Sequence, residues 1–140
     1  MKLREILQHK GAQVHSASPD DSLGDVVGKL VAKNCGALVV LEGSRIAGII
    51  SERDVLRACA ELKQPLEALV RNRMTSELVT TTPDDDLEHV MGLMTNHRIR
   101  HLPVLESGEL KGVVSIGDIV KAQHSELSYE NRVLKQYIQG

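Results

Sequence analysis

Gly112-Val-Val-Ser-Ile-Gly-Asp-Ile-Val-Lys-Ala122 joins a short run of β-branched residues to a segment whose apolar residues recur at helical spacing. Such a change of period predicts a strand that runs directly into a helix. Ser115 and Asp118 lie at the junction. Gly48-Ile-Ile-Ser-Glu-Arg-Asp-Val-Leu-Arg-Ala58 has the same design, with Ser51 and Asp54 at its junction. The chain therefore carries this polar junction twice.

The two junctions belong to a duplication that spans most of the chain. Ser115 lies 64 positions after Ser51, and Asp118 lies 64 positions after Asp54. At this one offset, without a gap, the later copy repeats the residue type of Pro19, Asp20, Asp21, Leu23, Val26, Gly28, Leu38, Val40, Leu41, Glu42, Gly48 and Ala58. Identities at a single offset, at turns and apolar positions alike, indicate an internal repeat.

Hydrophobic spacing and turn residues predict the same order of elements in each copy. For the first copy we expect a helix at 2–8, an edge strand at 14–16, a helix at 23–34, a hairpin of strands at 36–41 and 45–50, and a helix at 52–62. For the second copy we expect a strand at 78–81, a helix at 86–97, strands at 101–106 and 110–114, a helix at 115–124, and then a separate C-terminal helix.

The predicted fold class is α+β (α/β-like), with two tandem β-α-β-β-α repeats. Neither copy is long enough for a full core, so we expect the repeats to pack sheet against sheet about a pseudo-twofold axis. The predicted organisation is 1–64 for the N-terminal helix and first repeat, 65–124 for the linker and second repeat, and 125–140 for the C-terminal helix.

Composition limits the class of protein. A hydrophobic content of 41% over 140 residues suffices for a compact core. A net charge of −2 gives no general attraction for nucleic acid, and Phe and Trp, which stack on single-stranded bases, are absent. No apolar run could span a bilayer, and the first residues look like an amphipathic helix rather than a leader. We expect a cytoplasmic protein that binds neither nucleic acid nor membranes, with Cys35 and Cys59 as buried, reduced thiols.

The two repeats resemble a known family. Their order of elements, the doubled Gly-apolar-apolar-Ser-x-x-Asp, and the segments Ser18-Pro-Asp-Asp21 and Arg98-Ile-Arg-His-Leu-Pro-Val104 resemble paired cystathionine-β-synthase (CBS) domains, which form a Bateman module. The resemblance covers about residues 11–124 and leaves no catalytic domain outside it. It implies a stand-alone CBS pair that binds an adenosine ligand in two clefts between the repeats and associates as a flat homodimer.

The resemblance makes Asp54 and Asp118 the acceptors of a ribose, with Ser51 and Ser115 beside them. A carboxylate can accept hydrogen bonds from both hydroxyls of a ribose, and a helix start favours an anion. The same Ser-x-x-Asp spacing is also that of a capping box, in which the two side chains bond to backbone N–H groups of the first turn. Its occurrence in both copies favours the ligand role.

The other implied ligand-binding residues fall into two groups. Strand and turn residues would form the adenine slot, where backbone atoms alone could read the base: Ser16, Ala17, Gly36, Ala37, Leu38, Thr80, Thr81, His101, Leu102 and Pro103. For the phosphate, Arg100 with His101 is the first candidate, because arginine can fork onto phosphate oxygens, and Arg53 is the second. The equivalents of these cations differ between copies, so we expect two unequal clefts.

Catalytic and metal motifs are missing from the sequence. His97 and His101 are four apart, but a helix-to-strand junction is expected between them, so we predict no metal site. No nucleophile and base are arranged as in known hydrolase or nucleotide-hydrolysis motifs. We therefore predict a non-enzymatic regulatory module without a catalytic cofactor, whose ligand is AMP first, with ADP and ATP possible, and whose protein target is unknown. An NAD(H) or S-adenosylmethionine sensor and a purely structural dimerisation module are the alternatives.

Overall fold

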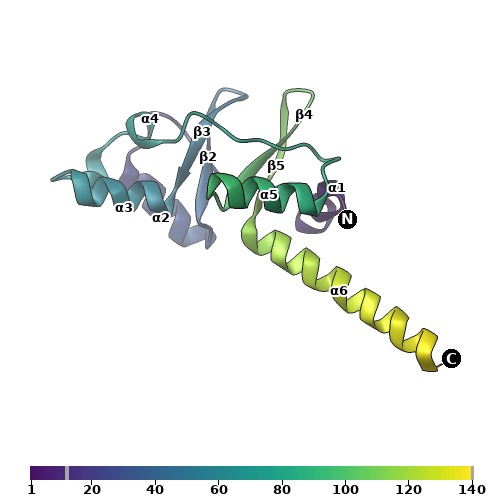
Figure 1. Cartoon of the computed structure of the whole chain (residues 1–140). Helices are drawn as coiled ribbons and strands as arrows, with labels where there is room; N and C mark the ends of the chain where they lie inside the picture. Colours follow the sequence, from purple (N-terminus) through teal and green to yellow (C-terminus); the bar gives the residue numbers. More distant parts are fainter. Residues whose placement is uncertain (12, 140) are drawn as a thin grey trace. The chain divides into compact units, whose positions relative to one another are not determined.

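The computed structural model describes residues 1–11 and 13–139 of the chain. These residues form two compact units, one of residues 13–78 and one that combines residues 1–11 with residues 79–139. Figure 1 labels the helices and strands of each unit. The first unit is continuous in sequence, whereas the second draws its elements from both ends of the chain.

The unit Gln13–Leu78 is built on a three-stranded sheet. Its elements are β1 (Ser16–Ala17), α2 (Leu23–Lys33), β2 (Ala37–Glu42), β3 (Arg45–Ser51), α3 (Glu52–Glu61), the 3-10 turn η1 (Pro65–Glu67) and α4 (Val70–Arg73). The strand order is β1-β2-β3, in which β1 runs parallel and β3 antiparallel to β2. Buried apolar residues from the sheet and helices form one core: Ala17, Leu23, Val26, Leu30, Leu38, Val40, Ile50, Ala58 and Val70.

The second unit contains a two-stranded sheet. Its elements are α1 (Leu3–Lys10), α5 (Leu87–His97), β4 (His101–Glu106), β5 (Glu109–Ser115) and α6 (Ile116–Gln139). Strands β4 and β5 are antiparallel. Its core also collects residues from all of these elements: Leu3, Ile6, Leu87, Val90, Met94, Leu102, Val104, Val114 and Ile119.

The duplication is visible in backbone detail. The β2–β3 hairpin has an irregular register between Val40 and Leu41, and the β4–β5 hairpin has the same irregularity between Val104 and Leu105. The C-cap residues that follow helices α2 and α5, Asn34 and Arg98, are both in the left-handed conformation. A matching bulge and matching helix ends confirm that the two copies share one local design.

Segments 1–7 and 68–74, which lead into the two copies, pack in equivalent ways. The backbone N–H of Leu3 donates to the carbonyl of Asp85 at 3.0 Å, and that of Val70 donates to the equivalent carbonyl, of Asp21, at 2.9 Å. The next residue in each segment repeats the pattern, because Arg4 N–H donates to Pro83 at 2.8 Å and Arg71 N–H to Pro19 at 3.0 Å. Each copy is therefore completed by the segment that leads into the other copy.

Helix α1, which precedes the first repeat in the sequence, packs in the core that contains residues of the second repeat. Three expectations differ from the structure. Instead of a strand at 78–81, only Thr81 forms an isolated parallel bridge, with Val104. The expected helices at 115–124 and at the C-terminal end are one helix, α6, whose far part extends beyond the other elements of its unit in Figure 1. Finally, Cys59 is exposed and Cys35 is only half-buried.

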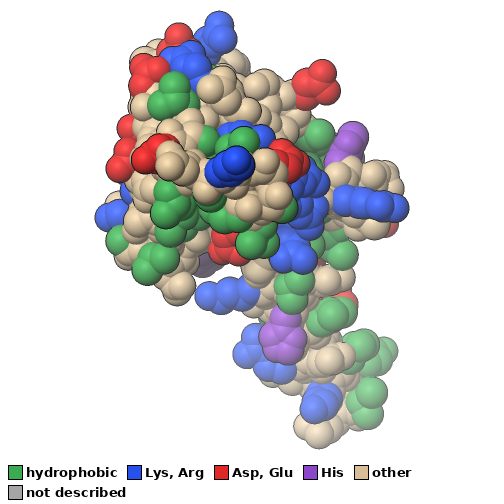
Figure 2. All heavy atoms as spheres, turned by 90° about the vertical axis from the view of Figure 1, so that its left-hand side faces the viewer, with side chains coloured by type: hydrophobic (Ala, Val, Ile, Leu, Met, Phe, Trp, Pro, Cys, Tyr) green, Lys and Arg blue, Asp and Glu red, His purple; other side chains and the backbone are tan. Residues whose placement is uncertain are grey.

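The far part of α6 carries exposed apolar side chains. Hydrophobic groups are visible among charged ones on this helix in Figure 2. The exposed members are Leu127, Tyr129, Val133, Leu134, Tyr137 and Ile138. By contrast Ile119, in the first turn, is buried in the core of the unit. Only the start of α6 is therefore held by packing within its own unit.

Candidate functional site

The junction of β3 and α3 is a capping box. The backbone N–H and the hydroxyl of Ser51 donate to Oδ2 of Asp54 at 2.9 and 3.0 Å, and Asp54 N–H donates back to Ser51 Oγ at 3.4 Å. These bonds satisfy backbone donors at the helix start, which would otherwise lack partners. Asp54 is 8% exposed. The structure therefore confirms the capping role that the sequence offered as an alternative for Ser51 and Asp54.

The junction of β5 and α6 repeats this geometry and adds a cation. Ser115 N–H donates to Oδ2 of Asp118 at 2.8 Å, and Asp118 N–H donates to Ser115 Oγ at 3.2 Å. The Nζ of Lys10, at the end of α1, donates to the same Oδ2 at 2.6 Å and to the carbonyl of Val113 at 2.7 Å. The two junctions are thus alike in capping and different in charge.

Capping leaves each carboxylate with acceptor capacity. All hydrogen bonds to Asp54 and Asp118 within residues 1–11 and 13–139 arrive at Oδ2, so Oδ1 of each receives none there. A carboxylate offers about four lone-pair positions over its two oxygens. Each aspartate can therefore cap its helix and still accept a hydrogen bond from a ligand.

The ionisation of Asp118 reflects its neighbours. Burial raises the pKa of this carboxyl, but the hydrogen bond from Lys10, the backbone N–H of Ser115 and the charge of Lys10 together outweigh that effect. The net result is a pKa below the ordinary 3.8. Asp118 is therefore an anion at neutral pH, paired with the Lys10 ammonium.

The strands place several predicted residues beside these junctions. Ala37 pairs with Ser51 across β2 and β3, and His101 pairs with Ser115 across β4 and β5. The preceding carbonyls also join the helix starts, because Gly36 accepts from Glu52 N–H at 3.0 Å and Arg100 accepts from Ile116 N–H at 2.8 Å.

Two clusters result, one in each unit. The Asp54 half-site contains Gly36, Ala37, Ser51, Arg53 and Asp54. The Asp118 half-site contains Arg100, His101, Ser115 and Asp118, together with Lys10.

The remaining predicted adenine residues lie mainly in the sheets and cores. Ser16 and Ala17 form β1, and the Ser16 carbonyl accepts from Lys29 Nζ at 2.9 Å. Thr81 exchanges backbone hydrogen bonds with β4, and its hydroxyl donates to Asp85, while Thr80 is exposed. Buried side chains cannot reach a ligand at the surface, which leaves backbone contact as the available role for Ala17, Leu38, Leu102 and Pro103.

Arg53 and Arg100 are available for an anion. Both side chains are exposed, and neither forms an ion pair with any residue in the described part of the chain. Arg53 lies between Ser51 and Asp54, and Arg100 immediately precedes β4. Each half-site therefore contains one exposed arginine.

Lys10 is the residue of the Asp118 half-site that sequence reasoning missed. It lies 108 positions before Asp118, on a helix without a counterpart of equal length in the other unit. Its only local signal is that a basic residue is favoured in the last turn of a helix. Contact with the junction follows from the packing of α1 and could not be read from spacing.

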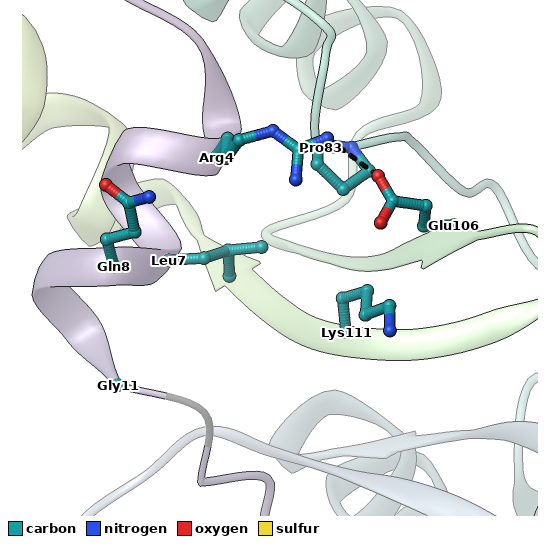
Figure 3. A pocket seen from close by; sticks show the side chains of 7 residues that line it. All are labelled: Arg4, Leu7, Gln8, Gly11, Pro83, Glu106 and Lys111. Carbon is teal, nitrogen blue, oxygen red and sulfur yellow. Dashed lines mark hydrogen bonds and ion pairs between the residues drawn. The ribbon is translucent and has the colours of Figure 1, made fainter.

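A separate pocket of about 390 Å³ lies between α1 and the β4–β5 hairpin (Figure 3). Arg4 in its lining donates to Glu106 at 2.7 Å and to Asp84 at 3.2 Å, so this guanidinium is already paired. The other lining residues are Leu7, Gln8, Gly11, Pro83 and Lys111. None of the residues predicted from the sequence lines this pocket, and we assign it no ligand.

Residues 1–11 and 13–139 contain neither a membrane-spanning helix nor a cluster of metal ligands. None of the helices there has the length and apolar character needed to cross a membrane. No group of three or more His, Cys, Asp or Glu side chains there is placed to hold a metal ion. The helix-to-strand junction expected between His97 and His101 is confirmed, since α5 ends at His97 and β4 begins at His101.

The fold and the doubled junction define a pair of CBS domains. The CBS domain profile matches residues 3–61 and 69–125, so the chain belongs to the CBS domain family. It is 37% identical to a mitochondrial CBS domain-containing protein of Arabidopsis thaliana, over 99% of this chain and 72% of that protein.

Solved structures are similar over most of the chain. A CBS-domain containing protein from Agrobacterium tumefaciens is 37% identical, with a TM-score of 0.86 over 88% of this chain and 99% of that chain. A CBS domain protein from Pyrobaculum aerophilum, solved in complex with AMP, is 28% identical, with a TM-score of 0.75 over 84% of this chain and 89% of that chain.

Proposed function

We propose that this protein is a non-enzymatic regulatory module that binds an adenosine nucleotide, with AMP favoured and ADP and ATP possible. The observation that carries the proposal is the repeated junction, in which a helix-capping aspartate keeps one carboxylate oxygen, Oδ1, for a ligand. A structural cap alone would require only Oδ2. The second oxygen fits a ribose hydroxyl, which needs an acceptor.

The surroundings of each aspartate suit the rest of a nucleotide. The start of a helix carries a partial positive charge, and an exposed arginine adds a full one in each half-site. The backbone at Gly36–Ala37 and Arg100–His101 adjoins the junctions and could read the edge of a base. Sugar, phosphate and base each therefore have a matching group within one half-site.

The related protein from Pyrobaculum aerophilum supports this choice of ligand, since it was solved with AMP. The sequence carries none of the known hydrolase or nucleotide-hydrolysis motifs, and this favours sensing over catalysis. We propose that ligand occupancy shifts the population of two arrangements of a homodimer and so signals to a protein target. A cytoplasmic location remains a prediction, which fractionation of cells would test.

Binding can be tested by calorimetry with AMP, ADP, ATP, adenosine, NADH and S-adenosylmethionine. We expect AMP to bind, and Asp54→Ala and Asp118→Ala each to weaken or remove one binding event. Asp25→Ala is the matched control, because Asp25 completes the capping box of α2 with Ser22 at 3.2 Å but belongs to neither half-site. Preferential binding of NADH or S-adenosylmethionine would change the ligand. The absence of binding by all six compounds at millimolar concentration would contradict the proposal and favour a structural module.

A further inference from the structure

The two units supply different hydrogen-bond donors to a pair of equivalent backbone carbonyls, those of Ile49 and Val113. Val113 lies 64 positions after Ile49, and each is two residues before the capping serine. The Ile49 carbonyl accepts from the backbone N–H of Thr75 at 2.8 Å. The Val113 carbonyl instead accepts from Lys10 Nζ at 2.7 Å. A side-chain ammonium thus takes the place of a backbone donor.

The difference arises because helix α1 is longer than helix α4. Helix α4 stops at Arg73, which lets Thr75 form a bridge with Ile49 in β3. Helix α1 continues to Lys10, so no backbone of that segment reaches β5 in the same way. The longer helix positions a lysine at the end of β5, next to Asp118.

Lys10 changes the charge of its half-site but leaves Oδ1 of Asp118 available as an acceptor. On Asp118 the Lys10 ammonium donates to Oδ2, and on Asp54 the Ser51 hydroxyl donates to the equivalent Oδ2. Each Oδ2 therefore has two donors, and Oδ1 is left in the same condition in both half-sites. What differs is that the Asp118 carboxylate is neutralised by a cation at 2.6 Å, whereas the donors that reach the Asp54 carboxylate from residues 1–11 and 13–139 are neutral.

We propose that Lys10 is a ligand-contacting residue of the Asp118 half-site that selects adenosine ligands carrying a phosphate; this inference rests on the proposed function. An ammonium has three N–H donors, and two of those of Lys10 are used by Val113 and Asp118. Within residues 1–11 and 13–139 the third N–H has no acceptor, which makes it available to an oxygen of the ligand. Pairing with Lys10 also removes the repulsion that a lone carboxylate would exert on a phosphate a few ångströms away.

The test is calorimetry with AMP and adenosine, in an Asp54→Ala background so that the Asp118 half-site is measured alone. We expect Lys10→Met to weaken AMP binding about tenfold and adenosine binding less than about twofold, the scale of one screened charge interaction. Lys10→Arg keeps the charge and is expected to retain most of the preference for AMP. Lys135→Met, an exposed lysine far along α6, is the matched control and is expected to change neither affinity.

The outcomes separate this inference from the proposed function. If the parent protein binds AMP and Lys10→Met loses AMP and adenosine equally, or loses neither, Lys10 does not select phosphate. Tighter binding of adenosine by Lys10→Met would show that the lysine competes with the ribose, which also overturns the inference. If the unaltered protein binds neither compound, the proposed function fails and this inference falls with it.

Discussion

Gly48 lies so close to Thr75 that a β-carbon at position 48 would come within 2.6 Å of the Thr75 carbonyl oxygen. Gly112, the equivalent glycine, meets a side chain instead, because its β-carbon would lie 2.8 Å from Cδ2 of Leu7. The backbone at Thr75 is fixed by its bridge to Ile49. The end of the Leu7 side chain can rotate, so the close contact at position 112 can be relieved.

The same substitution at the two glycines should therefore have unequal effects. We expect Gly48→Ala to lower the free energy of unfolding by about 1–3 kcal/mol, the usual cost of overpacking, and Gly112→Ala by less. Chemical denaturation of the two variants measures the difference directly. Equal losses, or a larger loss at Gly112, would contradict the arrangement of Thr75 in this structure.

Stability should depend on acid pH through Asp118. A carboxyl whose pKa is lower in the folded state contributes stability above its unfolded pKa, near 3.8, and that stability disappears as the pH falls through the folded value. Lys10→Met removes the hydrogen bond and charge that lower this pKa, so the variant should lose less stability than the parent protein below about pH 4. Asp85, whose pKa is also lowered, contributes in the same range, but it is common to both proteins and cancels in the comparison.

Thermal unfolding of the parent protein and Lys10→Met between pH 2 and 7 would measure this effect. Parallel curves across that range would show that the ion pair does not persist in solution.

The leading segment of the first copy should be essential to the other unit. Leu3 is fully buried in the core that α1 shares with α5, β4, β5 and α6. Leu3→Ala should cost about 2–5 kcal/mol of stability, as is typical for a large-to-small change in a core. Amide hydrogen exchange should show the loss of protection mainly in residues 79–122. A loss centred on residues 13–78 would mean that α1 packs against the first copy instead.

The far part of α6 should contribute little to the stability of its unit. Its apolar side chains at Leu127, Leu134, Tyr137 and Ile138 are more than half exposed. A chain that ends at Ser128 should therefore unfold within about 0.5 kcal/mol of the full chain, as expected for changes to exposed surface. Gel filtration of the same pair checks whether this segment joins two copies. A clear fall in stability together with a smaller assembly would indicate that copies of the chain associate through α6.

Much of the fold could be predicted because the chain repeats itself. The hairpins and helices follow from the hydrophobic period and the turn residues. An element predicted in one copy also supports the equivalent element in the other copy. The break expected near residue 124 was wrong because Ser125, a residue that often marks a helix end, bonds to the Lys121 carbonyl at 3.1 Å within a continuous helix. Periodicity cannot show whether a polar residue ends a helix or is accommodated in it.

The candidate site was predictable in part. Ser51, Asp54, Ser115 and Asp118 follow from a local motif, and their capping bonds are formed between residues three positions apart. Lys10 reaches Asp118 across most of the chain, and no short-range pattern encodes such a contact. A difference in charge between the half-sites was expected from Arg100 and Arg53. The structure adds a second source of this difference, which is Lys10 in α1.

Segments 1–7 and 68–74 each pack against the copy that they do not lead into, and this arrangement affects the order of folding during synthesis. Residues 13–78 form a unit from a continuous stretch, so this unit can fold as soon as that stretch has left the ribosome. Helix α1 is made before this unit, yet its partners at residues 83–87 are made only after it. Closing that long loop costs chain entropy before any contact is gained. Helix α1 is therefore expected to be among the last elements to pack, although it is made before the elements that it contacts.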